Sequence, residues 1–223
     1  FQAEDGIRDI GVTGVQTGAL PILMNRSAFS SWSAVAKCLH WMTVLMIAAV
    51  VPAGFVMTAT YGPSLKDRHL LPLHTLASQL HHTLGFLVLA VALVWSYRRA
   101  RVGRPSWDPG VAAWQRVIAK PTHFALLVLL IVVPVSGWAA LSALADSPQF
   151  GPTHIWFFGA DRWLPRIVAP LAFDDPAGYR QYARVHIAAL WVGLALICLH
   201  AGSAFWHHFM RRDGVLRAMW PLG

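Results

Sequence analysis

The sequence alternates between four long apolar segments and shorter polar connections. The apolar segments cover about residues 34–59, 73–97, 122–144 and 183–210. Each is longer than the roughly 20 residues that a helix needs to cross the hydrocarbon core of a bilayer. Because only helices and closed barrels satisfy their backbone polar groups in lipid, runs of this length predict helices. The pattern therefore predicts an all-α, integral membrane four-helix bundle that occupies residues 24–223, with a kink in the first helix at Pro52 and Gly54.

The charges of the connections predict how the bundle is oriented in the membrane. Four spans place both termini on the same side. A basic loop that starts with Arg98 to Pro105 and continues to Lys120, and an arginine-rich tail after the fourth span, lie on that side. An excess of Lys and Arg marks the cytoplasmic side, so we expect both termini in the cytoplasm. Two connections lie on the opposite side, a short one over residues 61–71 and the longest one over residues 145–182.

Residues 1–23 differ in character from the rest of the chain. They are rich in glycine and contain no apolar run long enough for a signal peptide. The segment resembles translated read-through of a sequencing adaptor. We therefore leave it out of the fold and expect the natural chain to start at Met24.

The composition agrees with a membrane protein. Hydrophobic residues make up 56% of the chain and charged residues only 13%, so the net charge of +8 does not indicate a nucleic-acid partner. Both cysteines, Cys38 and Cys198, lie inside apolar segments, which argues against a disulfide framework. The chain has no Cys-x-x-Cys-His motif, so covalent c-type haem attachment is not indicated.

Four histidines inside the spans are the candidate functional residues, because intramembrane histidines are costly and usually functional. His186 and His200 are fourteen residues apart in the fourth span. They share one helix face and lie roughly 21 Å apart along its axis. The predicted topology places His40 at the depth of His200, and His81 at the depth of His186. We call His40 and His200 the inner pair, and His81 and His186 the outer pair.

Two histidine pairs at different depths are suited to two b-type haems. A haem iron with two imidazole ligands is six-coordinate and transfers electrons instead of binding oxygen. Gly85, on the face of His81, and Gly193, midway between His186 and His200, are predicted to leave room for the haems. The alternative is that the histidines form hydrogen bonds between helices and that the glycines allow close helix packing.

Other histidines are assigned weaker roles. His123, at the inner start of the third span, is expected to face a lipid headgroup or a quinone. His82 is expected to pack beside His81. His207 and His208 lie near the inner surface, where a solvated histidine is the default expectation.

Several blocks of the sequence resemble the bacterial cytochrome b561 family. The most specific part of the resemblance is C-terminal and comprises His186, the run from His200 to His208, Arg212-Asp213-Gly214 and Arg217 to Pro221. Four further blocks also match: residues 36–41, 81–85, 123 and 134–138. Members of the family are four-helix, di-haem membrane proteins that exchange electrons with a quinone pool. One branch oxidises superoxide at the outer face and reduces ubiquinone.

The resemblance implies specific residues and ligands. It places the haem ligands at His40, His81, His186 and His200, and it aligns His207 with a second histidine of the C-terminal block. His207 is therefore, with His123, a candidate for contacting a quinone or supporting a haem ligand. The resemblance also implies ubiquinone as the electron acceptor and the bacterial inner membrane as the location. The long connection over residues 145–182 departs from the family pattern on the side where a donor would arrive.

Two functions are compatible with these observations. In the first, the protein is an oxidoreductase that passes electrons from an outer-face donor, with superoxide as one candidate, to the membrane quinone. In the second, it is a membrane-anchor subunit that relays electrons for a soluble dehydrogenase or hydrogenase, docked on the outer loop around Trp156 and Trp163. A transporter with histidine proton relays is disfavoured, because the four spans contain no acidic residue.

Overall fold

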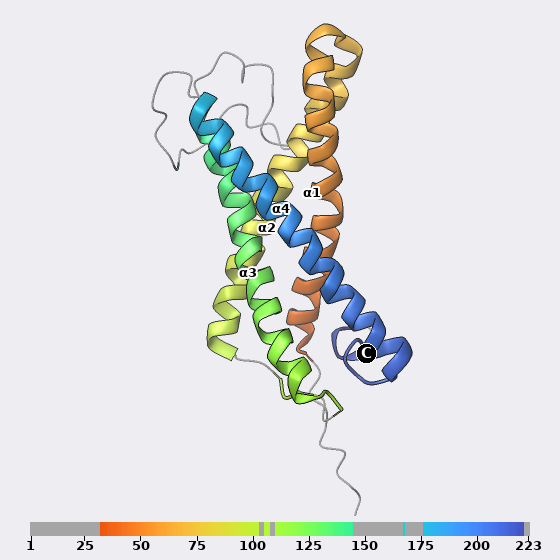
Figure 1. Ribbon diagram of the computed structural model, residues 1–223. Coiled ribbons are helices and arrows are strands. Elements are labelled where there is room, and N and C mark those ends of the chain that lie inside the picture. Colours follow the sequence, from red (N-terminus) through yellow and green to blue (C-terminus); the bar gives the residue numbers. More distant parts are fainter. Residues whose placement is uncertain (1–31, 103–104, 108–109, 145–166, 168–175, 221–223) are drawn as a thin grey trace, which may run out of the picture.

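The computed structural model describes residues 32–102, 105–107, 110–144, 167 and 176–220. Its four long helices are α1 (Ala34–Lys66), α2 (Leu71–Val102), α3 (Ala113–Ala143) and α4 (Pro176–Trp206). Three short helical elements accompany them: η1 (Arg68–Leu70), η3 (His207–Arg211) and η4 (Arg217–Met219). Figure 1 shows the long helices running alternately up and down, so that α1 begins and α4 ends at the same end of the bundle. No strand occurs among these residues, which confirms the predicted all-α bundle.

The side chains are distributed as in a membrane protein. Each of the four long helices is long and apolar enough to cross a bilayer. Large apolar side chains such as Leu45 and Leu199 point outward and are 69% and 67% exposed. The helix contacts are instead made by small residues, and Ser78 and Ser142 are the largest side chains that are fully buried in the described part of the chain. Small residues at the contacts allow the close helix approach that is typical of bundles in lipid.

The bundle consists of two helical hairpins. α1 packs along α2, and α3 packs along α4, while α2 and α3 provide most of the close backbone contact between the hairpins. α1 and α4 make hardly any close backbone contact with each other. The space between α1 and α4 is therefore bridged by side chains, among them the histidines described below.

The helices extend beyond their predicted spans. α1 continues through Pro52 and Pro63 to Lys66, so most of the expected polar loop over residues 61–71 is helical. α3 begins at Ala113, inside the predicted basic loop, and α4 begins at Pro176, inside the predicted connection over residues 145–182. The apolar pattern ends where charged residues begin, but helical hydrogen bonding continues into the membrane interface, where long charged side chains reach water.

Three sequence predictions concern residues outside this description. They are the adaptor-like segment over residues 1–23, the start at Met24, and the outer-loop docking surface around Trp156 and Trp163.

Candidate functional site

The structure brings the four predicted histidines together as two ring pairs. In the inner pair, the ring centroids of His40 on α1 and His200 on α4 are 6.2 Å apart, with the ring planes at 71°. In the outer pair, the centroids of His81 on α2 and His186 on α4 are 6.0 Å apart, with the planes at 81°. Both pairs therefore join α4 to a helix of the other hairpin, as the depth argument predicted.

Backbone carbonyl groups orient both rings of the outer pair. His81 Nδ1 donates a hydrogen bond to the Val50 carbonyl oxygen at 2.9 Å, and His186 Nδ1 donates to the Val133 carbonyl oxygen at 2.7 Å. Because a carbonyl oxygen can only accept, Nδ1 carries the proton in both rings. In the neutral imidazole that binds a metal, this leaves Nε2 as the nitrogen available for coordination. Hydrogen bonds of this kind hold metal-ligating histidines in a fixed orientation.

Each outer histidine also lies against a glycine, one helical turn after its carbonyl partner. A Cβ atom at Gly54 would lie 2.7 Å from His81 Cε1, and a Cβ atom at Gly137 would lie 3.1 Å from His186 Cε1. The first distance is shorter than any ordinary contact between carbon atoms, and the second is tight. These two positions therefore need glycine for the imidazole rings to approach the helices.

The two glycines share a local sequence pattern. A proline precedes each of them within the same helical turn: Pro52 in α1 and Pro134 in α3. From the sequence, Gly54 was predicted only to kink the first helix, and Gly137 was given no role in the site. The signal that could have revealed both positions is a proline followed within one helical turn by a glycine, on the two helices that carry none of the outer histidines.

The two glycines that the sequence analysis selected lie apart from the histidine rings. A Cβ atom at Gly85 would meet no described atom within 4 Å, and one at Gly193 would meet only Leu129 Cδ1, at 3.9 Å. The open space at Gly85 is compatible with a bound haem. The role of both glycines in haem binding stays a prediction.

Aromatic rings surround the inner pair. The His200 ring centroid is 4.9 Å from that of His123 on α3, whose Nδ1 donates to the Ala119 carbonyl oxygen at 2.6 Å. The His40 ring packs edge-on against Trp41, with centroids 5.7 Å apart. Within the described residues, neither His40 nor His200 forms a hydrogen bond to a backbone carbonyl. The inner rings are therefore positioned by neighbouring aromatic side chains, and His123 belongs to the inner site.

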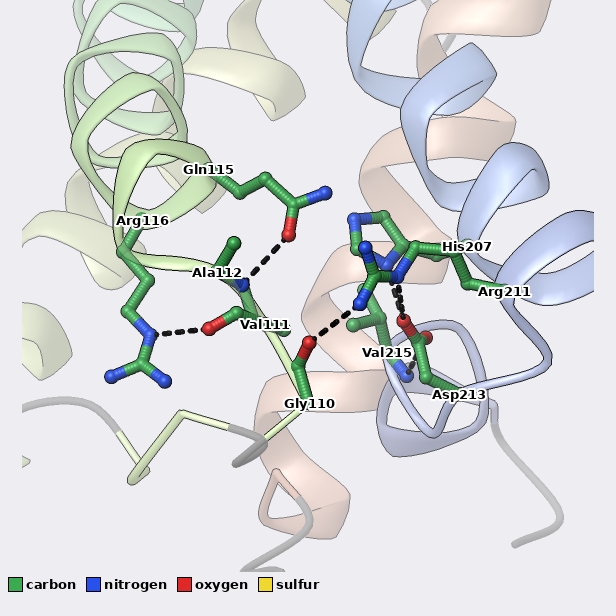
Figure 2. Close-up of polar contacts among 9 residues, drawn as sticks. All are labelled: Gly110, Val111, Ala112, Gln115, Arg116, His207, Arg211, Asp213 and Val215. Carbon is green, nitrogen blue, oxygen red and sulfur yellow. Dashed lines mark hydrogen bonds and ion pairs between the residues drawn. The ribbon is translucent and has the colours of Figure 1, made fainter.

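A buried polar cluster follows the end of α4 (Figure 2). His207, in the π-helical turn η3, is only 5% exposed, and its Nδ1 lies 2.5 Å from Asp213 Oδ2. Arg211 Nε lies 3.6 Å from the same oxygen, and the Arg211 guanidinium donates to the Gly110 carbonyl oxygen at 2.8 Å. The expectation of a solvated histidine is therefore wrong for His207, because Asp213 follows the π-helical turn and covers it.

The histidines that neighbour these sites differ in burial. His82 is buried, and its ring centroid is 5.9 Å from that of His81, in agreement with the expected packing role. His208 is half-buried and packs against the ring of Phe209, with centroids 4.9 Å apart.

Comparison with known proteins identifies the family. Residues 31–222 match the prokaryotic cytochrome b561 family. The chain belongs to this family. Cytochrome b561 homolog 1 of Escherichia coli (strain K12) is 26% identical over 183 residues, which cover 82% of this chain and 93% of that protein. Cytochrome b561 homolog 2 of the same strain is 23% identical over 190 residues, which cover 84% of this chain and 90% of that protein.

Membership confirms the resemblance drawn from the sequence and gives the general function. Cytochromes b561 are helical membrane proteins that bind b-type haem, and their function is transmembrane electron transfer. The histidine geometry of this cytochrome b561 fits that group. When two imidazole nitrogens lie on opposite sides of one metal ion, each about 2 Å from it, the ring centres are roughly 6 Å apart. The inner and outer pairs have this spacing, whereas the 4.9 Å between His123 and His200 is too short for it.

Proposed function

We propose that this cytochrome b561 holds two b haems and passes electrons between a donor at the outer face and a membrane quinone at the inner face. His81 and His186 would hold the outer haem, and His40 and His200 the inner one. The observation that carries the proposal is the 6.0 Å and 6.2 Å spacing of the two ring pairs. A haem held by two histidines supplies one-electron transfer with no open position for oxygen.

The protein's own contribution at the outer site is the orientation of the two imidazole rings. The Val50 and Val133 carbonyl groups accept from Nδ1 of the two histidines, which leaves Nε2 of each ring available to bind the haem iron. Gly54 and Gly137 let the two rings sit close to α1 and α3. Such fixed orientation and an apolar surrounding are the means by which a protein tunes a haem.

The described basic residues support an inner-membrane protein with cytoplasmic termini. Most of them gather at the end of the bundle where α1 begins and α4 ends: Lys37, Arg98, Arg99, Arg101, Arg116, Lys120, Arg211, Arg212 and Arg217. The opposite end carries fewer: Lys66, Arg68, Arg180 and Arg184. Because cytoplasmic segments carry the excess of Lys and Arg, this asymmetry favours the first end as the cytoplasmic one.

The cluster around His207 is suited to quinone reduction at the inner face. A quinone takes up two electrons and two protons to become a quinol, so its site needs a group that delivers protons. The Asp213 carboxylate accepts a hydrogen bond from His207 Nδ1 and holds the imidazole in one orientation, so that proton exchange with a quinone oxygen would take place at Nε2. His123, beside His200, is the second candidate for this role. The resemblance to the superoxide-oxidising branch makes ubiquinone the proposed acceptor.

Asp213→Asn tests the role of this cluster. We expect the rate of quinone reduction to fall on the order of a hundredfold, because the neutral amide no longer orients the His207 imidazole through a carboxylate hydrogen bond. Asparagine keeps an oxygen that can accept from the Val215 backbone N–H, so the turn should be preserved. Stopped-flow reduction of ubiquinone-1 by the pre-reduced protein measures the rate, and the visible spectrum checks that both haems are retained. An unchanged rate would exclude the cluster from quinone chemistry.

The whole proposal is tested by the visible spectrum and by turnover of the purified protein. We expect a b-type reduced-minus-oxidised spectrum, about two haems per chain, and reduction of ubiquinone by candidate donors that include superoxide. Purified protein without haem would contradict the proposal. Haem-containing protein that reduces quinone only with a soluble dehydrogenase or hydrogenase bound would favour the membrane-anchor function.

A further inference from the structure

The chain after η3 folds back onto the beginning of α1. We refer to residues Asp213 to Trp220, which include η4, as the C-terminal turn. Trp41 Nε1 donates a hydrogen bond to the Met219 carbonyl oxygen at 2.8 Å. The Trp41 ring also packs edge-on against Trp220, with centroids 5.7 Å apart and planes at 83°. Trp41 thus attaches α1 to the C-terminal turn, although 178 positions separate Trp41 from Met219.

The C-terminal turn has internal hydrogen bonds that fix its path. Arg212 has a φ of 52°, in the left-handed region, and so reverses the chain after η3. The Asp213 N–H donates to the His207 carbonyl oxygen, and Asp213 Oδ1 accepts from the Val215 N–H. The Ala218 N–H donates to the Gly214 carbonyl oxygen, and Ala218 is buried. The Met219 carbonyl therefore reaches Trp41 from a defined position.

Trp41 lies between this turn and the inner site. Its ring packs edge-on against His40, with centroids 5.7 Å apart and planes at 80°. The outer histidines have backbone carbonyl groups that prevent ring rotation, whereas the described surroundings of His40 contain no such hydrogen bond. The His40 imidazole instead has edge-on ring contacts with Trp41 and His200, and the contact with Trp41 connects it to the C-terminal turn.

We propose that the C-terminal turn positions Trp41 against His40 and thereby sets the plane of the His40 imidazole at the inner site. Trp41 is in this sense a positioning residue for an axial ligand, and the motif Arg217 to Trp220 provides its anchor. The inference rests on the proposed function, in which His40 is a haem ligand. Groups that orient a metal ligand from outside the coordination shell tune the properties of the metal.

Substitutions at the two ends of the contact test the proposal in the full-length, haem-loaded protein. Trp41→Phe keeps a ring but removes the N–H donor, and Trp41→Leu removes both. Trp220→Leu removes the ring contact from the side of the turn. We expect each variant to shift the low-spin ferric EPR signal and the midpoint potential of the inner haem, with the largest shift for Trp41→Leu and no shift of the outer haem.

The double variant Trp41→Leu, Trp220→Leu separates positioning from general stability. If the turn acts only through Trp41, the double variant will show the same shift as Trp41→Leu alone, because the turn then has no ring left to position. Trp114→Phe is the matched control, since Trp114 lies on α3 near the same end and is 62% exposed. This control should leave both haems unchanged.

The outcomes distinguish this inference from the proposed function. The inner haem is identified as the one that is lost in His200→Ala. Unchanged inner-haem signals in Trp41→Phe and Trp220→Leu, or equal shifts of both haems, would overturn the positioning role while leaving the proposed function intact. Wild-type protein that contains no haem, or in which His40→Ala leaves both haems unaltered, would contradict the proposed function itself. If Trp41→Leu does not fold, the other two single variants decide.

Discussion

Replacing His200 by alanine should remove one haem and leave the other with its spectrum and potential. His200 and His40 face each other at the inner site, so the variant retains only one of the two imidazoles that would hold that iron. His186→Ala should remove the other haem for the same reason. Each substitution should lower the haem content per chain by about half and abolish electron transfer between the two faces. Haem quantification and redox titration of the purified variants provide the measurement.

Two further histidines serve as controls for this result. His69→Ala, at an exposed position in η1, should leave both haems in place. His123→Ala should also retain both haems, because its ring is too close to His200 for the two to share one iron. Depletion of the same haem by His186→Ala and His200→Ala would show that the proposed pairing is wrong.

Gly54→Ala should strongly reduce the occupancy of the outer haem. The new Cβ atom would lie 2.7 Å from His81 Cε1, so the imidazole must move. It cannot move away without weakening its hydrogen bond to the Val50 carbonyl oxygen. Overpacking of this kind costs about 1–3 kcal/mol. If that cost falls on the haem-bound state, the outer haem will be held roughly five- to 150-fold more weakly.

Two other glycine-to-alanine variants provide a weaker version of the Gly54 substitution and a control for it. Gly137→Ala should have a smaller effect at the same site, because its Cβ atom would lie 3.1 Å from His186 Cε1. Gly62→Ala lies in the same helix as Gly54 and would meet no described atom within 4 Å, so it should retain both haems. Titration of apoprotein with haemin gives the affinities. Equal haem affinities for Gly54→Ala and Gly62→Ala would refute the role assigned to Gly54.

The parts of the structure that follow from helix geometry could be predicted from the sequence. Apolar runs of more than twenty residues specify membrane helices, and the rise of 1.5 Å per residue fixes the depth of each histidine. The separation of fourteen positions between His186 and His200 therefore predicted two sites at different depths. Up-and-down connectivity then matched His200 with His40 and His186 with His81, and the structure brings the rings together in those combinations.

Features that depend on contacts between distant backbone atoms could not be predicted in this way. The Val50 and Val133 carbonyl groups have no signature in the side-chain sequence, so their hydrogen bonds with His81 and His186 were not predicted. The burial of His207 arises from the reversal of the chain at Arg212, which residue composition does not reveal. The contact between Trp41 and Met219 joins opposite ends of the described chain.

The arrangement of the two hairpins has a consequence for biogenesis. Each candidate ligand pair takes one histidine from the α1–α2 hairpin and one from the α3–α4 hairpin, whose direct contact comes mainly from α2 and α3. Each hairpin satisfies its own backbone hydrogen bonds, so the translocon can insert the two hairpins one after the other. Haem binding at each histidine pair would then link the two hairpins and stabilise the assembled bundle. Maturation of the protein would therefore depend on the cellular haem supply.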